Sequence, residues 1–68
     1  MMYKVTWIGA DEALHFEAES EVALGQALLD YVDTTYEVDS ETDGTDVWYM
    51  DEDGEPVFVM RGIRIEEE

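Results

Sequence analysis

The sequence contains no cysteine, a single histidine, a single proline and only three Lys or Arg residues. The absence of cysteine excludes a disulfide framework and a thiolate metal site. Because binding to phosphates requires Lys and Arg, three such residues argue against direct contact with nucleic acid. The apolar runs span only a few residues, whereas a membrane span needs about 20, and the N-terminus lacks a signal-peptide core. We therefore expect a soluble, cytoplasmic protein that makes no membrane contact.

The chain also lacks a recognisable set of catalytic residues. His15 is the only histidine and lies in a predicted strand, and Ser20 fits a helix cap better than a nucleophile. Acid/base catalysis by carboxylates needs a raised pKa in a dry cleft, and nothing in so short a chain indicates a cleft. We predict that the protein is not an enzyme and uses no cofactor.

Acidic residues dominate what is present. The 68 residues include 19 Asp or Glu, which gives a formal net charge of −16. High net charge is one mark of disorder, but 46% hydrophobic and 12% aromatic residues are enough to form a core. We predict one folded domain over residues 1–68. Since like charges repel, we expect a monomer or a small homo-oligomer.

The first half of the chain predicts a hairpin followed by a helix. Residues 2–8 and 13–18 alternate between apolar and polar side chains, as half-buried strands do, and a four-residue turn joins them. Apolar residues at three- and four-residue spacing predict an amphipathic helix over about 20–33, with Ser20 as its N-cap. Gly25 inside this helix suggests close packing against a sheet.

The second half predicts more strand. Residues 36–46 are polar and form either a long loop or a short edge strand, and residues 47–50 form a strand. An Asp-Gly hairpin connection leads into residues 57–65, which we interpret as one central strand with a bulge at Gly62. Glu66–Glu68 should be a frayed tail.

This order of elements predicts an α+β protein with two layers, in which one helix packs on a four-stranded, mainly antiparallel sheet (ββαββ). Parallel pairing of the first and last strands would make the fold similar to a β-grasp. A plain antiparallel sheet fits nearly as well.

The acids are concentrated in one part of the chain, because nine of the 19 lie in residues 36–55 with no basic residue among them. In an extended segment, Asp39, Glu41 and Asp43 would form a row with about 6.6 Å between neighbours. Each strand of duplex DNA carries one phosphate per about 3.4 Å, so the row and nearby acids offer a comparable charge density. The run from Asp39 to Gly44 imitates the start of a calcium loop, but Met50 replaces the bidentate Glu. We therefore predict no specific metal site.

Acids also occupy the end of the predicted helix. Asp30 and Asp33 lie where the helix dipole disfavours negative charge. The sequence shows no contact within the chain that would offset this unfavourable placement. We therefore infer that the negative charge at this end of the helix serves an interaction with another molecule. Lys4, Arg61 and Arg64 fall on strands that we expect to be adjacent, away from the acidic stretch.

Aromatic residues lie between the carboxylates. Trp48 and Tyr49 are neighbours on a strand, so one should face the core and the other the opposite side, while Phe58 should be core. Tyr36 is a further candidate, since Tyr and Trp are enriched at interface hot spots. The predicted partner-binding residues are Asp30, Asp33, Tyr36, Glu37, Asp39, Glu41, Asp43, Asp46, Trp48, Tyr49, Asp51, Glu52, Asp53 and Glu55.

In size, charge and lack of catalytic residues the chain resembles the acidic DNA-mimic inhibitors that phages use against host defence, which include anti-CRISPR and anti-restriction proteins. These inhibitors share no motif, so the resemblance assigns no residue roles. It implies a basic nucleic-acid-binding protein as partner, such as a Cas effector or a restriction enzyme, which is inhibited by occlusion without turnover.

Two alternatives remain open. A small domain from a salt-loving organism would also be acidic and poor in lysine, although its charge should be spread evenly. An accessory β-grasp-like interaction module that binds through a sheet edge is the third interpretation.

Overall fold

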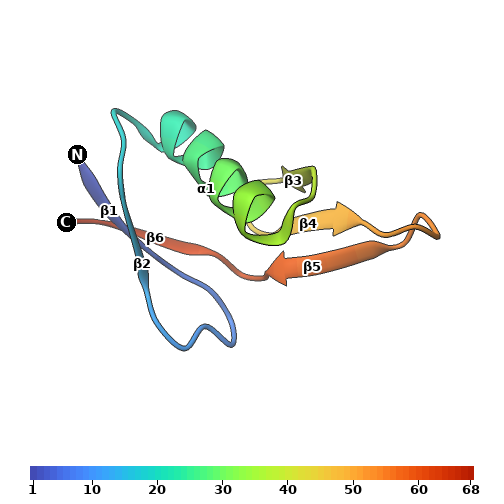
Figure 1. Cartoon of the computed structure of the whole chain (residues 1–68). Coiled ribbons are helices and arrows are strands. Elements are labelled where there is room, and N and C mark those ends of the chain that lie inside the picture. The colour runs from blue at the N-terminus through green and yellow to red at the C-terminus, as the bar shows by residue number, and fades with distance from the viewer.

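A computed structural model describes all 68 residues as an α+β protein with one helix and two three-stranded antiparallel sheets (Figure 1). Along the chain the elements are β1 (Met2–Thr6), β2 (Leu14–Glu17), α1 (Glu21–Tyr36), β3 (Ser40–Thr42), β4 (Val47–Met50), β5 (Pro56–Met60) and β6 (Arg64–Glu67). The prediction of an α+β protein is confirmed, whereas the prediction of a single four-stranded sheet is wrong.

The first sheet has the strand order β2-β1-β6, with β1 in the centre. The predicted hairpin is present, since β1 and β2 pair with Tyr3 opposite Phe16. Its strands are shorter than predicted, and residues 7–13 join them instead of a four-residue turn. Tyr3 and Val5 on β1 face the core with 4% and 0% of their surface exposed, as the alternating pattern predicts. Lys4 between them lies on the outer face of this sheet.

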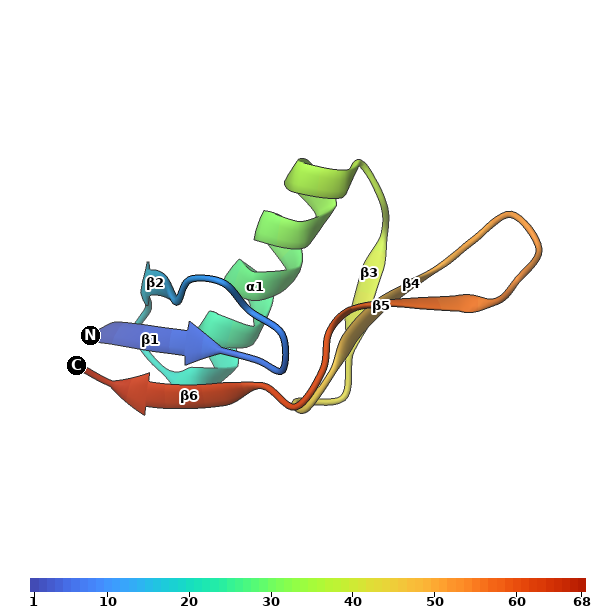
Figure 2. The ribbon, with the colours of Figure 1, turned by 90° about the horizontal axis from the view of Figure 1, so that it is seen from below.

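The second sheet has the strand order β3-β4-β5. Its β4–β5 hairpin turns at Gly54, whose φ of 78° lies in the left-handed region that glycine adopts readily. Figure 2 shows that this hairpin extends away from the first sheet and past the helix. The molecule is accordingly elongated, with principal extents of 39 × 22 × 19 Å.

Residues 57–65, predicted as one central strand, are divided between the two sheets. Gly62 has a φ of 64°, and the chain turns there between β5 and β6. The backbone on both sides of the turn is held by distant residues, because Ile8 N–H donates to the Arg61 carbonyl at 2.8 Å and Ile63 N–H donates to the Thr45 carbonyl at 2.7 Å. The turn therefore separates a strand that pairs with β4 from one that pairs with β1.

The last strand corrects two further predictions. β6 runs antiparallel to β1, with Val5 opposite Ile65, so the parallel pairing of a β-grasp is wrong. The C-terminal acids are not a frayed tail, because Glu66 and Glu67 belong to β6 and Glu68 N–H donates to the Met2 carbonyl at 2.8 Å. Pairing with β1 satisfies the backbone groups of this segment and so orders it.

Helix α1 begins where the sequence predicts and ends one turn later. Ser20 caps it by accepting a hydrogen bond from Ala23 N–H at 3.2 Å. Its other end is Glu37, which adopts the left-handed conformation with a φ of 56°. A Cβ at Gly25 would meet nothing within 4 Å, so the inferred close packing at this glycine is wrong. The helix contributes Leu24, Leu28 and Val32, which are spaced four residues apart, to the core. The other core residues are Tyr3, Val5, Val47 and Met60.

Candidate acidic binding surface

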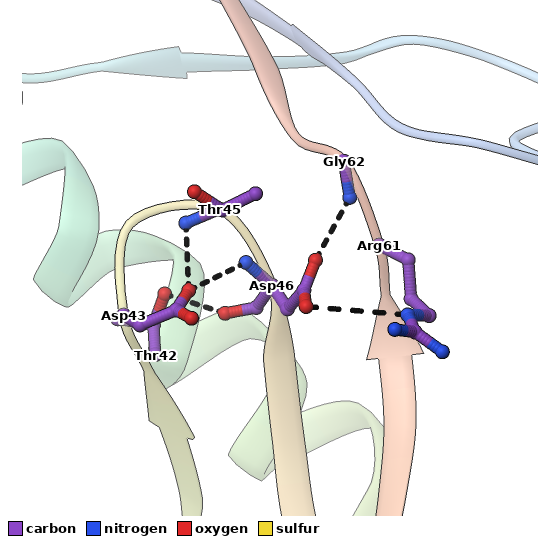
Figure 3. Close-up of polar contacts among 6 residues, drawn as sticks. All are labelled: Thr42, Asp43, Thr45, Asp46, Arg61 and Gly62. Atoms are coloured by element: carbon purple, nitrogen blue, oxygen red, sulfur yellow. Dashed lines mark hydrogen bonds and ion pairs between the residues drawn. The ribbon is translucent and has the colours of Figure 1, made fainter.

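Two aspartates of the acidic stretch form the turn between β3 and β4 (Figure 3). The Asp43 carboxylate accepts hydrogen bonds from Asp46 N–H at 2.8 Å and Thr45 N–H at 2.9 Å. These bonds favour the charged form and hold the pKa of Asp43 below its ordinary value. Thr42 completes the turn by donating its hydroxyl to the Asp46 carbonyl at 2.8 Å. Asp43 therefore lies in the turn after β3 and Asp39 directly precedes β3, so only Glu41 of the predicted row lies within the strand.

Asp46 connects this turn to the junction of the two sheets. Its Oδ1 accepts a hydrogen bond from Gly62 N–H at 2.9 Å, and its Oδ2 lies 4.0 Å from Arg61 Nε (Figure 3). The Asp46 side chain is only 20% exposed. Asp46 thus holds the β5–β6 turn in place as well as carrying charge.

Two further aspartates bind backbone N–H groups. The Asp51 carboxylate accepts from the N–H groups of Asp53 and Glu55, both at 2.9 Å, and shapes the β4–β5 turn. Asp33 Oδ1 accepts from Ser40 N–H at 2.7 Å and from the Ser40 hydroxyl at 2.6 Å, which ties the end of the helix to β3. The inference that Asp33 has no internal role is therefore wrong.

The other predicted acids are exposed. Asp30 accepts a hydrogen bond from Gln26 Nε2 at 3.0 Å on the helix surface. Six of the predicted acids accept no hydrogen bond at the carboxylate and form no ion pair within the chain, and we call these six the free acids. The free acids are Glu37, Asp39, Glu41, Glu52, Asp53 and Glu55.

The aromatic pair faces opposite sides of the second sheet, as predicted. Residues opposite each other in an antiparallel ladder share a face, and Trp48 lies opposite both Glu41 and Phe58. Tyr49 lies opposite Ser40, which contacts the helix through Asp33, so Tyr49 is on the helix side. Trp48 is therefore the member that faces away from the core, and both rings are half-buried.

Phe58 is an aromatic residue whose position the sequence did not predict correctly. It was expected in the core but is 41% exposed, on the same outward face as Trp48. The two rings lie 6.0 Å apart, and the Arg61 guanidinium lies 4.3 Å from the Phe58 ring centroid. Residues 57–60 are apolar at every position, so their pattern could not indicate which face is outward. Tyr36 lies apart from this group at the end of the helix and is 52% exposed.

The basic residues are concentrated on the first sheet. Lys4 and Arg64 lie on the adjacent strands β1 and β6, and Lys4 Nζ is 3.8 Å from a Glu66 carboxylate oxygen. His15 Nδ1, on β2, is 2.6 Å from Glu68 Oε1. Arg61 differs from the prediction, because it lies at the sheet junction beside Asp46. The acidic stretch therefore has one nearby cation, and the first sheet has the rest.

The surface offers charge and aromatic rings without a concave site. No pocket is present, and no three acidic or histidine side chains converge closely enough to hold a metal ion. The run that imitates a calcium loop consists of β3 and the turn after it, where Asp43 binds backbone N–H groups. An arrangement of this kind can attract and contact a partner.

The fold and this surface together define a small α+β protein with a strongly acidic end. No family model, curated protein or solved structure matches the chain. No helix is long and apolar enough to cross a membrane.

Proposed function

We propose that the protein is a noncatalytic acidic inhibitor that binds a basic nucleic-acid-binding protein and occludes its nucleic-acid site. A Cas effector or a restriction enzyme is a partner of this kind, and binding would take place in the cytoplasm. The single observation that carries the proposal is the division of the acids into two groups. Four aspartates bind backbone N–H groups and fix the backbone of one end, while six free acids at the same end have no partner in the chain.

The free acids support this proposal through their placement. Glu41 lies on β3 and Asp39 directly precedes this strand, two residues away. Residues two apart in a strand are spaced by about 6.6 Å, close to twice the phosphate spacing of one DNA strand. Glu52, Asp53 and Glu55 lie at the tip of the protruding hairpin. A groove rich in Lys and Arg would be attracted to such a surface at a rate that falls with salt.

Competition with nucleic acid tests the proposal directly. The immobilised protein is used to capture proteins from a lysate, and bound proteins are eluted with duplex DNA at constant ionic strength. Each eluted protein is then bound to labelled DNA, and the free inhibitor is added while fluorescence anisotropy is followed. We expect release of the DNA at one inhibitor per DNA site, and weaker release as salt increases.

Two triple variants with the same change of charge separate location from net charge. One variant replaces Glu37, Asp39 and Glu41 by the corresponding amides. The control variant does the same at Asp11, Glu12 and Glu19, which form no ion pair or side-chain hydrogen bond. We expect the association rate to fall roughly tenfold for the first variant and much less for the control. Equal losses would contradict recognition at the acidic end.

Adaptation to salt is the alternative that one observation favours. Asp11, Glu12, Glu19 and Glu21 add exposed acids outside the acidic stretch. A halophilic domain should fold only in molar salt, whereas an inhibitor should be folded in dilute buffer. Far-UV circular dichroism across this range distinguishes them.

A further inference from the structure

The outer face of the second sheet carries large apolar side chains that no other element covers. Trp48 and Phe58 are cross-strand neighbours there, and Met50 and Pro56 form the next pair along the same two strands. Phe58 and Met50 are 41% and 54% exposed. We call these four residues, together with Glu41, the outer aromatic face. Trp48 is half-buried and Phe58 is exposed, and Trp is enriched at interface hot spots.

Arg61 of the chain itself contacts this face. Its guanidinium lies 4.3 Å from the centre of the Phe58 ring, a distance typical of a cation–π contact. The same side chain is 62% exposed and only 4.0 Å from the Asp46 carboxylate. The ring and the carboxylate together therefore hold an arginine side chain at the surface of the chain itself.

Trp48 likewise places an aromatic ring beside a carboxylate. Its direct neighbour on β3 is Glu41, one of the free acids. None of the chain's own cations stacks on the Trp48 ring, and Trp is the aromatic residue that binds cations best. Trp48 and Glu41 thus repeat, for an incoming group, the pairing that Phe58 and Asp46 make with Arg61.

We propose that the outer aromatic face binds arginine side chains of the partner, with the Trp48 ring stacking on a guanidinium and Glu41 pairing with it. This builds on the proposed function, since it names the group by which a basic protein is held. Arginine fits better than lysine, because the planar guanidinium both stacks on rings and forms paired hydrogen bonds with a carboxylate. A second copy of the chain fits poorly, because a net charge of −16 on each molecule opposes association.

Peptides of nine arginines and nine lysines, titrated into the protein at the same ionic strength, test this proposal. Isothermal calorimetry gives the two affinities, and the NMR signal of the Trp48 indole N–H reports contact at the face. Both peptides carry the same charge, so long-range attraction alone predicts equal binding. Paired hydrogen bonds to carboxylates also favour arginine, so the part of the preference that stacking contributes is the part lost in Trp48→Leu. We expect the arginine peptide to bind about two- to fivefold more tightly, the order of one exposed cation–π contact.

Variants locate that preference. Trp48→Leu should bring the ratio of the two affinities close to one, whereas Tyr31→Leu, an exposed aromatic residue that packs on Phe16 of the first sheet, should leave it unchanged. Arg61→Gln should increase the ratio, because it frees the Phe58 ring for the peptide. If Trp48→Leu does not fold by circular dichroism, Glu41→Gln replaces it and should reduce the same ratio.

Equal affinities for the two peptides would overturn the proposal, as would equal effects of Trp48→Leu and Tyr31→Leu. A dimer in sedimentation that Trp48→Leu abolishes would assign the face to a second copy and also overturn it. The peptide assay and the DNA-displacement assay fail independently. If Trp48→Leu still displaces DNA at full strength, the proposed inhibition stands and the arginine contact is refuted. If the protein prefers the arginine peptide but displaces no DNA, the proposed occlusion is refuted and the arginine contact stands.

Discussion

Replacing Asp33 by alanine should lower the free energy of unfolding by about 2 kcal/mol. Asp33 Oδ1 accepts two hydrogen bonds from Ser40, at 2.7 and 2.6 Å, and bonds to a charged group contribute roughly 1.5–3 kcal/mol each. Because both bonds involve one pair of residues and are only partly buried, we count them together at the upper end of that range. Removing a negative charge from the end of a helix returns about 0.3–1 kcal/mol.

A loss of this size is large for so small a protein, whose total stability should be roughly 3–10 kcal/mol. Urea denaturation followed by circular dichroism at 222 nm measures it, and the melting temperature should fall by about 8–15 °C. Asp33→Asn is the matched variant. Since both hydrogen bonds end on a single oxygen, the amide oxygen can accept both, and most of the stability should be retained.

Asp30→Ala on the same helix is the control, because its carboxylate contacts only the exposed Gln26 side chain. We expect a change within about 0.5 kcal/mol. The reasoning would be refuted if Asp33→Ala were as stable as Asp30→Ala, or if Asp33→Asn lost as much as Asp33→Ala. The first result would mean that the hydrogen bonds of Asp33 do not stabilise the fold and that Asp33 contributes only negative charge to the surface.

Four other predictions concern the turns, the helix and the net charge. Gly62→Ala should cost about 1–2 kcal/mol in urea denaturation, because Gly62 has a φ of 64° and a Cβ there would lie 2.9 Å from Ile8 Cδ1, whereas Gly25→Ala should stabilise the helix by up to about 1 kcal/mol. Asp43→Ala should be less stable than the parent chain near neutral pH. Because hydrogen bonding lowers the pKa of Asp43, its contribution to stability is present above the ordinary carboxyl pKa and is lost as pH falls through the lowered value, so the free energies of unfolding of the two proteins should converge as the pH is lowered. Adding 0.5 M sodium chloride should raise the melting temperature, as screening reduces repulsion within a chain of net charge −16; no change would indicate that the acids do not destabilise the fold.

Local patterns in the sequence predicted most of the elements. The Ser20 cap, the apolar stripe of the helix and the alternation of Tyr3 and Val5 each depend on residues within a few positions of one another. Such patterns reflect the periods of helix and strand, which a sequence displays directly. The β1–β2 and β4–β5 hairpins were predicted for the same reason, although the connection between β1 and β2 is longer than predicted.

The candidate surface was only partly predictable. The concentration of acids in residues 36–55 and the opposite orientations of Trp48 and Tyr49 follow from the sequence. The sequence did not show that Asp33 and Asp46 bind backbone N–H groups seven and 16 residues away. Every acid has the same appearance in a sequence, whether it binds a distant backbone group or faces solvent.

The sequence by itself therefore determined the helix, the hairpins, the net charge and the part of the chain that carries the acids. Tertiary structure decided that the last strand divides at Gly62, that its second half joins β1, and that Phe58 faces outward beside Trp48. The physical reason is distance along the chain. These features depend on contacts such as Ile8 with Arg61 and Asp46 with Gly62, which form only when two sheets meet and bring remote segments together.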